Sequence, residues 1–156
     1  MDLDVVLSLL RALAVGKVQY VLIGGVALNL HGLARATADI DLFVAPDADN
    51  VAKLRTALNA VFSDPEISNI KSEDLMGAYP AIQYVPPSGG FHIDILARLG
   101  EAFAFSDIES EEREIDGVLV TLATPRMLYR MKKDTVRLQD RADAERLRRN
   151  FKLEEE

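Results

Sequence analysis

The chain contains no cysteine among its 156 residues, and this absence removes several kinds of chemistry at once. Disulfide bridges, thiolate metal ligands and thiol nucleophiles are all excluded. The sequence also has only two histidines, so a zinc site built from several histidines is not expected. A metal site in this chain would therefore have to depend on its carboxylates.

Long hydrophobic runs are also missing. The apolar stretches at residues 21–23 and 118–120 are far shorter than the roughly 18 to 20 residues that a membrane span needs. The first four residues, Met-Asp-Leu-Asp, carry acid where a signal peptide carries base. We therefore expect a cytoplasmic protein that does not associate with a membrane.

The overall composition is that of a globular protein. Hydrophobic residues make up 49% of the chain and charged residues 28%, both close to the average for folded domains. The length suits one hydrophobic core. We predict a single domain over residues 1–156, with a C-terminal helical segment at about residues 125–151.

Charge is distributed unevenly along an acidic chain. The net charge is −7, which disfavours non-specific nucleic-acid binding as the main function, because phosphate contacts dominate that affinity. Residues 126–149 nevertheless hold nine Lys and Arg against four Asp and Glu. This basic segment is either a solvated helix face with internal ion pairs or a surface for an anionic ligand.

Hydrophobic periodicity predicts a mixture of helices and strands. Apolar residues at helical spacing indicate helices over residues 3–14 and from about residue 50 to residue 61. Short β-branched runs indicate strands at residues 19–23, 39–44 and 118–122, and residues 81–85 and 91–96 form an expected hairpin around the loop 86–90. Residues 62–79 show no clean period.

Residues that are typical of turns and helix ends refine this pattern. A glycine pair follows the strand at 19–23, and a short helix is expected over residues 26–30. Asp116-Gly117 is a hairpin signal, and Thr124-Pro125 marks the start of a helix that extends to about residue 151, with a break expected near Asp140. An α/β or α+β fold with a mixed central sheet flanked by helices follows.

Three acidic residues point to metal chemistry. Asp39 and Asp41 are two positions apart on a predicted strand, so their side chains share one face. Asp94 lies between Ile93 and Ile95 on another apolar strand, where an acid needs a partner. Divalent cations relieve such repulsion, and three carboxylates suit two ions that hold a transferring phosphoryl group. Solvent-facing charge on an edge strand is the alternative explanation for Asp39 and Asp41.

Gly24 and Gly25 complete the pattern. Glycines at a strand-to-helix turn allow backbone N–H groups to approach phosphates closely, although a glycine pair seen alone usually marks only a tight turn. His31, at a helix end, is expected to have a capping role. His92 falls on the same predicted face as Asp94, near the acids, and is not among the predicted site residues.

These motifs together resemble the signature of the DNA polymerase β-like nucleotidyltransferase superfamily. The run Val-Leu-Ile-Gly-Gly-Val-Ala at residues 21–27 and the run Arg-Ala-Thr-Ala-Asp-Ile-Asp-Leu at residues 35–42 are similar to those of small stand-alone relatives of abortive-infection type IV toxin nucleotidyltransferases. Lys132, Arg137, Asp140 and Asp143 resemble the C-terminal residues of that group. Ile23 departs from the pattern, since the larger toxins often carry Lys there.

The resemblance implies a nucleotidyltransferase fold and a Mg²⁺-dependent transfer of a nucleoside monophosphate from an NTP to a hydroxyl. It implies that Asp39, Asp41 and Asp94 are catalytic and bind two Mg²⁺ ions. It also implies that Gly24, Gly25, Arg35 and Lys132 bind the nucleotide. For Lys132 the alternative is a surface residue, and for Arg137, Asp140 and Asp143 it is a structural ion-pair network.

The acceptor stays open in the sequence. A tRNA, a protein and a small molecule are all compatible with the pattern, and a role in a toxin–antitoxin pair, with a protein partner, is an expectation from the resemblance. A different class of function is a non-catalytic, antitoxin-like partner that binds nucleotide or protein without turnover. The intact acids count against that alternative, because a domain freed from catalysis gains by losing clustered like charges.

Overall fold

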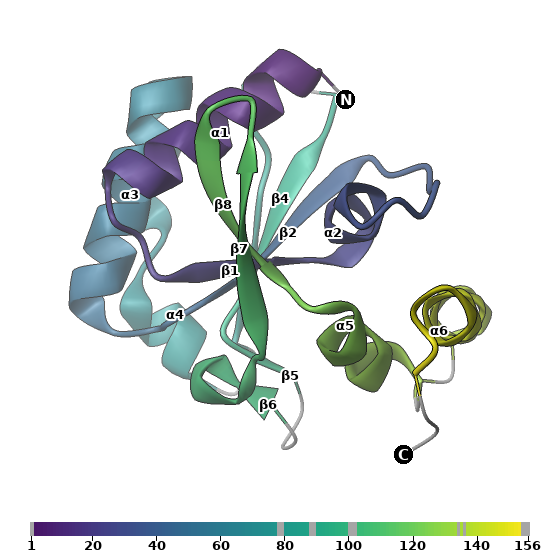
Figure 1. Cartoon of the computed structure of the whole chain (residues 1–156). Coiled ribbons are helices and arrows are strands. Elements are labelled where there is room, and N and C mark those ends of the chain that lie inside the picture. The colour runs from purple at the N-terminus through teal and green to yellow at the C-terminus, as the bar shows by residue number, and fades with distance from the viewer. Residues whose placement is uncertain are drawn as a thin grey trace.

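The computed structural model describes residues 2–77, 80–87, 90–99, 103–133, 135 and 137–153. In this part of the chain, six strands form a mixed central sheet in the order β3-β4-β2-β1-β8-β7 (Figure 1). These strands are β1 (Tyr20–Ile23), β2 (Asp39–Val44), β3 (Ala81–Tyr84), β4 (His92–Leu96), β7 (Ser110–Ile115) and β8 (Val118–Ala123). Two short strands, β5 (Arg98–Leu99) and β6 (Phe103–Ala104), pair separately.

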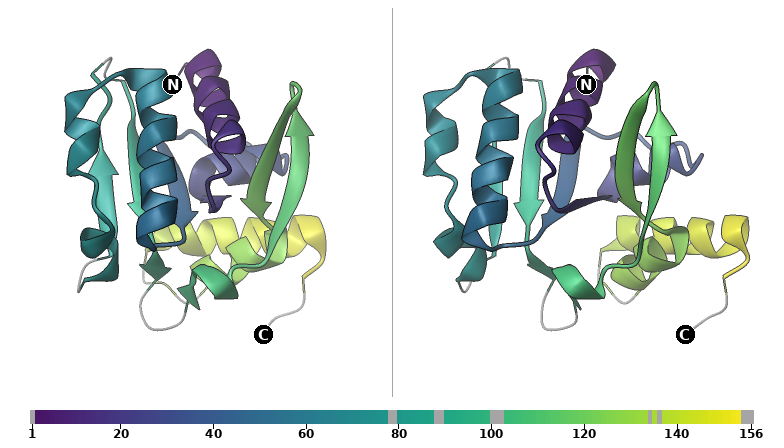
Figure 2. Two further views of the ribbon diagram at one scale, coloured as in Figure 1. Left: turned by 90° about the vertical axis from the view of Figure 1, so that its left-hand side faces the viewer. Right: turned by 60° about the vertical axis from the view of Figure 1, so that its left-hand side comes forward.

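Helices cover both sides of this sheet. Helices α1 (Leu3–Val15) and α3 (Ala48–Phe62) lie on one side, and α2 (Gly24–Leu30) lies on the other (Figures 1 and 2). Helices α5 (Pro125–Lys132) and α6 (Leu138–Phe151) pack against each other at one end of the sheet. This arrangement confirms the predicted mixed sheet flanked by helices, with a helical C-terminal segment.

The strand register follows from the alternation of apolar and polar residues. Strand β2 runs antiparallel to β1 and parallel to β4. Ile40, Leu42, Ile93 and Ile95 are fully buried, while the residues between them on β2 and β4 turn toward the opposite face. Because side chains alternate along a strand, this one pattern places the apolar set in the core and the acids on the α2 side.

Several predicted helix boundaries are confirmed by their caps. The side chain of Asp2 accepts a hydrogen bond from the backbone of Asp4 at the start of α1. The side chain of Asp47 accepts one from Asn50 at the start of α3. Thr124 caps α5, with Pro125 at the first helical position. Each of these side chains satisfies a backbone N–H that has no acceptor within its helix.

Other boundaries differ from the prediction. Helix α2 begins at Gly24 itself, whose positive φ of 71° follows directly on β1. The C-terminal helix is interrupted after Lys132 and resumes at Leu138, so the predicted break is present but lies a few residues before Asp140. Asp140 itself lies in the first turn of α6, where an acid is favourable.

The middle segment and two hairpins are also resolved. Residues 62–79, which had no period, contain the 3₁₀ helix η1 (Pro65–Asn69) and α4 (Ser72–Met76). Strands β3 and β4 form the predicted antiparallel hairpin, although residues 88–89 of its loop lie outside the described residues. The hairpin at Asp116-Gly117 is confirmed, and a further 3₁₀ helix, η2 (Phe105–Asp107), precedes β7.

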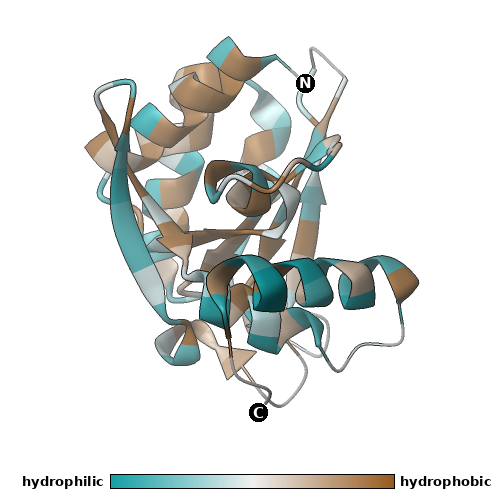
Figure 3. Cartoon of the chain, turned by 45° about the vertical axis from the view of Figure 1, so that its right-hand side comes forward, coloured by the Kyte–Doolittle hydropathy of each residue, from teal (hydrophilic) through white to brown (hydrophobic). Residues whose placement is uncertain are grey.

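Helix α6 is mostly hydrophilic along its length (Figure 3). Its buried positions are Asp143, Ala144 and Leu147, so it contacts the rest of the chain along a narrow stripe. Among the described helices, none combines the length and the apolar character that crossing a bilayer requires.

Asn50 joins the ends of β1 and β2 that lie away from the acids. Its side chain is buried, and it donates hydrogen bonds to the carbonyls of Gln19 and Ala45 and accepts one from the backbone N–H of Gln19. A single side chain thus satisfies three backbone groups where α3 crosses the sheet.

Asn50→Ala is expected to destabilise the protein by about 1 to 3 kcal/mol, because it leaves buried backbone groups unsatisfied. Chemical denaturation followed by circular dichroism measures this change. Asn59→Ala is the matched control, since Asn59 is exposed on the same helix and its replacement should change stability by about 0.5 kcal/mol at most. Equal effects of the two substitutions would contradict the assigned role of Asn50.

Candidate active site

Four polar side chains share one face of the neighbouring strands β2 and β4. Because these strands are parallel and in register, Asp39 lies opposite His92 and Asp41 lies opposite Asp94. All four are partly buried. The predicted convergence of Asp39, Asp41 and Asp94 on one place is therefore present, with a histidine as the fourth member.

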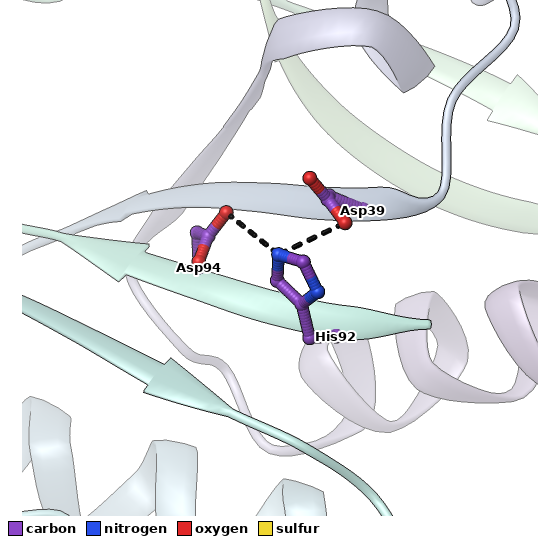
Figure 4. Close-up of side chains that lie close together, drawn as sticks. All are labelled: Asp39, His92 and Asp94. Atoms are coloured by element: carbon purple, nitrogen blue, oxygen red, sulfur yellow. Dashed lines mark ion pairs between the residues drawn. The ribbon is translucent and has the colours of Figure 1, made fainter. Parts of the chain in front are cut away.

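His92 extends across the gap between two of the acids (Figure 4). Its Nε2 atom lies 2.9 Å from Oδ1 of Asp39 and 3.5 Å from Oδ2 of Asp94. Among the described residues, Asp39, His92 and Asp94 form a group whose ligand atoms all lie within 4.8 Å of one another. Such a group has the donor types and the spacing to hold a metal ion.

Asp41 is the most strongly perturbed of the acids. Burial raises its pKa to about 7, and the nearby carboxylates of Asp94 and Asp39 act in the same direction, whereas the Lys132 ammonium acts against them. The metal-free site therefore resists carrying all of its negative charge. A divalent cation would supply the missing compensation.

Gly24 allows Asp41 to occupy this position. A Cβ atom on Gly24 would lie 2.0 Å from Oδ2 of Asp41, and the positive φ of Gly24 also disfavours other residues. Gly25 packs as closely against the preceding loop, since its Cβ would lie 2.9 Å from Cβ of Thr37. The glycine pair is thus required by contacts with the acid and with the loop that leads to it.

Thr37 fixes the start of the acidic strand. Its hydroxyl donates to the carbonyl of Asp39 at 3.0 Å and accepts from the backbone N–H of Asp39 at 3.3 Å. The threonine of the Arg-x-Thr-x-Asp pattern therefore holds the backbone in the turn that aims Asp39 at His92.

A cavity of about 200 Å³ opens beside Asp41. Gly24 and Asp41 lie on its sheet side, and Lys132, Thr135 and Asp140 lie on the side of α5 and α6. Four larger hollows, of about 260 to 690 Å³, are lined by other parts of the chain and by none of these acids. The chemistry of the lining, rather than size, therefore identifies the smaller cavity as the candidate site.

Asp143 joins the two predicted nucleotide-binding cations. Its side chain is fully buried, and its Oδ2 atom lies 3.0 Å from Arg35 and 3.1 Å from Lys132. Lys132 also pairs with Asp140 at 3.2 Å. Burial tends to raise the pKa of Asp140, but the charge and hydrogen bonds of Lys132 outweigh it, so the pKa is lowered overall.

These contacts bear on the alternatives that the sequence left open. Lys132 is only 12% exposed, so it is not a free surface residue. Arg137, at 73% exposure and 4.0 Å from Asp140, lies at the margin of an ion-pair network centred on Asp143. Arg35 is linked to the same network, and Arg146 of α6 donates to the carbonyl of Ala34 beside it.

The donor set fits a divalent cation. Oδ1 of Asp39 is shielded from solvent and accepts no hydrogen bond within the described part of the chain, even though His92 lies nearby. A carboxylate oxygen that accepts no hydrogen bond can serve as a ligand of a metal ion. Asp41 and Asp94 lie opposite each other on paired strands. Asp41 therefore adds a further carboxylate beside the group formed by Asp39, His92 and Asp94.

Sequence reasoning undervalued His92. The signal was present, because His92 and Asp94 are two residues apart on one strand and must share a face. His31, in contrast, follows α2 as expected, and its ring is 2% exposed, with Nε2 2.8 Å from the carbonyl of Ala123. That contact joins α2 to β8 and lies outside the acidic cluster.

Comparisons with known proteins agree with this geometry. Residues 8–109 match the model of a family described as nucleotidyl transferase AbiEii toxin, type IV toxin–antitoxin system. The match includes both glycines, Arg35 and all three acids, and it ends before Lys132. A search of curated proteins found no match.

Solved structures extend the likeness of fold to nearly the whole chain. An antigenic nucleotidyltransferase-like protein from Paracoccidioides brasiliensis aligns with a TM-score of 0.56 at 18% identity, over 94% of this chain and 75% of its own. ANT(2″)-Ia, solved in complex with adenylyl-2″-tobramycin, aligns with a TM-score of 0.56 at 16% identity, over 96% and 90%.

The family match covers well over half of the chain, and the fold and the paired acids of β2 and β4 agree with it. The chain therefore belongs to the AbiEii family of nucleotidyltransferase toxins of type IV toxin–antitoxin systems, and it is a nucleotidyltransferase.

Proposed function

We propose that the protein is a Mg²⁺-dependent enzyme that transfers a nucleoside monophosphate from an NTP to a hydroxyl group. The observation that carries this proposal is the gathering of Asp39, Asp41 and Asp94 on one face of two paired strands, next to Gly24. Like charges that are held together in this way destabilise the fold unless a bound cation neutralises them.

In the proposed reaction, the oxygen of an acceptor hydroxyl forms a bond to the α-phosphorus of the NTP. The bond from that phosphorus to the bridging oxygen of the β-phosphate breaks, and pyrophosphate leaves with the bonding electrons. The hydroxyl proton passes to a carboxylate, for which Asp94 is the proposed base, and from there to solvent.

Asp39, Asp41 and Asp94 are the proposed metal ligands. A bound divalent cation neutralises phosphate charge and lowers the barrier to in-line displacement. The elevated pKa of Asp41 supports this assignment, because it indicates a carboxylate whose ionised form lacks a sufficient partner in the protein alone.

The triphosphate is proposed to enter the cavity beside Asp41. Its volume of about 200 Å³ is below the roughly 300 to 1,000 Å³ of pockets that hold a whole small molecule, so it suits the phosphates rather than the nucleoside. Backbone N–H groups of Gly24 and Gly25 in the first turn of α2 lack acceptors within the helix, and Lys132 supplies positive charge from the opposite wall. Arg35, which pairs with Asp143, would contribute a further positive charge toward the triphosphate.

A non-catalytic, antitoxin-like role is the weaker proposal. It would require the acids to be retained without a function, at a cost that the raised pKa of Asp41 makes evident. A toxic role in the cell, and a partner that neutralises it, are proposed here from the description of the family.

Transfer of label from each α-³²P-labelled NTP, with Mg²⁺ and a cell extract separated into RNA, protein and small molecules, tests the proposed reaction. Wild-type protein is expected to label one fraction, and Asp39→Asn to lower that labelling by about 10² or more, as expected for a lost metal ligand. The labelled fraction identifies the acceptor class.

Glu114→Gln is the matched control, because Glu114 is exposed on β7, and it should label as well as wild type. Equal labelling by wild type and Asp39→Asn would contradict the assignment of the acids. If neither protein labels any fraction while wild type binds NTP in a metal-dependent way, the non-catalytic role replaces transfer.

Asp41→Asn should stabilise the metal-free protein at neutral pH. In the unfolded chain Asp41 loses its proton near pH 4, whereas in the folded protein, where its pKa is about 7, it keeps the proton up to about pH 7. The stability of the wild-type protein therefore falls as the pH rises through this window. The stability of the variant does not decline in this way. Above pH 7 its free energy of unfolding should exceed that of the wild type by at most about 4 kcal/mol.

Thermal melts in EDTA from pH 4 to pH 8 measure the difference, with Glu114→Gln as the control that follows wild type. The variant should also lose the rise in melting temperature that a bound divalent cation gives to wild type. A variant that is less stable than wild type at pH 8 and keeps its response to the ion would show that the site is assigned wrongly.

Gly24→Ala should abolish transfer, with a loss of about 10² or more, because the new Cβ would displace the carboxylate of Asp41. Gly32→Ala is a close control. Gly32 also has a positive φ, of 90°, but a Cβ there would meet nothing within 4 Å. Both variants carry backbone strain of about 1 to 2 kcal/mol, so melting temperatures should fall in both while activity separates them.

A further inference from the structure

His92 is the one member of the four-residue array that the three-carboxylate scheme does not use. On β4 it lies opposite Asp39 of β2 and two residues before Asp94, and its imidazole lies between these two acids (Figure 4). The side chain is 30% exposed, and its Nε2 atom is the ring atom that lies beside the two acids. This position places a nitrogen donor within a site that otherwise offers oxygen.

The spacing of the donor atoms matches that of ligands around one ion. Octahedral sites hold their ligands at about 2.1 Å from the metal, which puts neighbouring ligand atoms about 3.0 Å apart. Nε2 of His92 lies 2.9 Å from Oδ1 of Asp39 and 3.5 Å from Oδ2 of Asp94. Nε2 thus lies near the separation expected of neighbouring ligands from one oxygen of each acid, and the ligand atoms of all three residues lie within 4.8 Å of one another.

The orientation of the closest pair gives a second observation. Oδ1 of Asp39 is shielded from solvent, and its contact with His92 is short, yet that oxygen accepts no hydrogen bond within the described residues. The oxygen therefore lies close to Nε2 of His92 and keeps its lone pairs free for a metal ion. A simple ion pair between the two side chains would align the N–H with the oxygen.

We propose that His92 is a direct ligand of the metal ion and that it shifts the preference of the site from Mg²⁺ toward Mn²⁺ or another first-row transition ion. Imidazole nitrogen binds such ions more strongly than it binds Mg²⁺, which favours oxygen ligands. The inference rests on the proposed metal site, and it adds a ligand and a metal preference that three carboxylates alone do not give.

The chain makes a direct spectroscopic test possible, because it contains only two histidines. The other, His31, is 2% exposed, and its Nε2 atom lies 2.8 Å from the carbonyl of Ala123 and 3.8 Å from Glu111, none of which belongs to the proposed metal site. Pulsed electron paramagnetic resonance of the full-length protein with Mn²⁺ should therefore detect imidazole ¹⁴N coupling that comes from His92. His92→Gln, which offers an amide in place of the ring nitrogen, should lack that coupling.

Affinity gives the second measurement. At fixed neutral pH, His92→Gln is expected to lower Mn²⁺ affinity by about tenfold or more, and to change Mg²⁺ affinity, measured by competition with Mn²⁺, much less. Glu114→Gln, on the exposed side of β7, should retain both affinities and the ¹⁴N coupling.

Other outcomes overturn the inference in distinguishable ways. If Mn²⁺ binds the wild type without ¹⁴N coupling, and Asp39→Asn does not bind Mn²⁺, the site has carboxylate ligands only. This result would overturn the role of His92 and leave the proposed function unaffected. A rise in affinity for both ions in His92→Gln would show that His92 competes with the metal for the acids. Absence of Mn²⁺ and Mg²⁺ binding with and without NTP would refute the proposed metal dependence together with the role of His92.

Discussion

Electrostatic repulsion among the acids of β2 and β4 is the constraint around which the rest of this end of the fold is arranged. The parallel register places Asp41 directly opposite Asp94, and partial burial weakens the screening of the two charges by water. The Lys132 ammonium reduces this cost only in part, because the pKa of Asp41 is still raised to about 7. The incomplete compensation is what makes the site ready for a cation.

The elements that bear the acids were predictable because they follow from local rules. Alternation along β2 and β4 fixes which side chains share a face, and apolar neighbours such as Ile93 and Ile95 identify the buried strands. Caps at Asp47 and Thr124 likewise depend on a few adjacent residues. For the same reason, the hairpins at residues 81–96 and at Asp116-Gly117 could be found from the sequence.

The parts that escaped prediction depend on tertiary contacts. The break between α5 and α6 was expected, but its exact position was not, because no proline or glycine marks it. Lys132 pairs with Asp140 and Asp143 across this break. The role of Gly24 as space for Asp41 becomes evident only when β1 and β2 are paired. Residues 65–76 contain two short helices, η1 and α4, whose buried apolar residues pack in the core shared with other elements and follow no local period.

The contact between α6 and the loop before β2 has a consequence for the order of assembly during synthesis. Arg146 binds the carbonyl of Ala34, 112 residues earlier in the sequence, and Asp143 pairs with Arg35 in the same region. A ribosome that makes the chain from its N-terminus finishes the acidic strands well before it finishes α6. The growing chain therefore carries its carboxylates while Arg35 still lacks its buried partner, Asp143, and the cationic side of the site reaches its final arrangement only after α6 has been made.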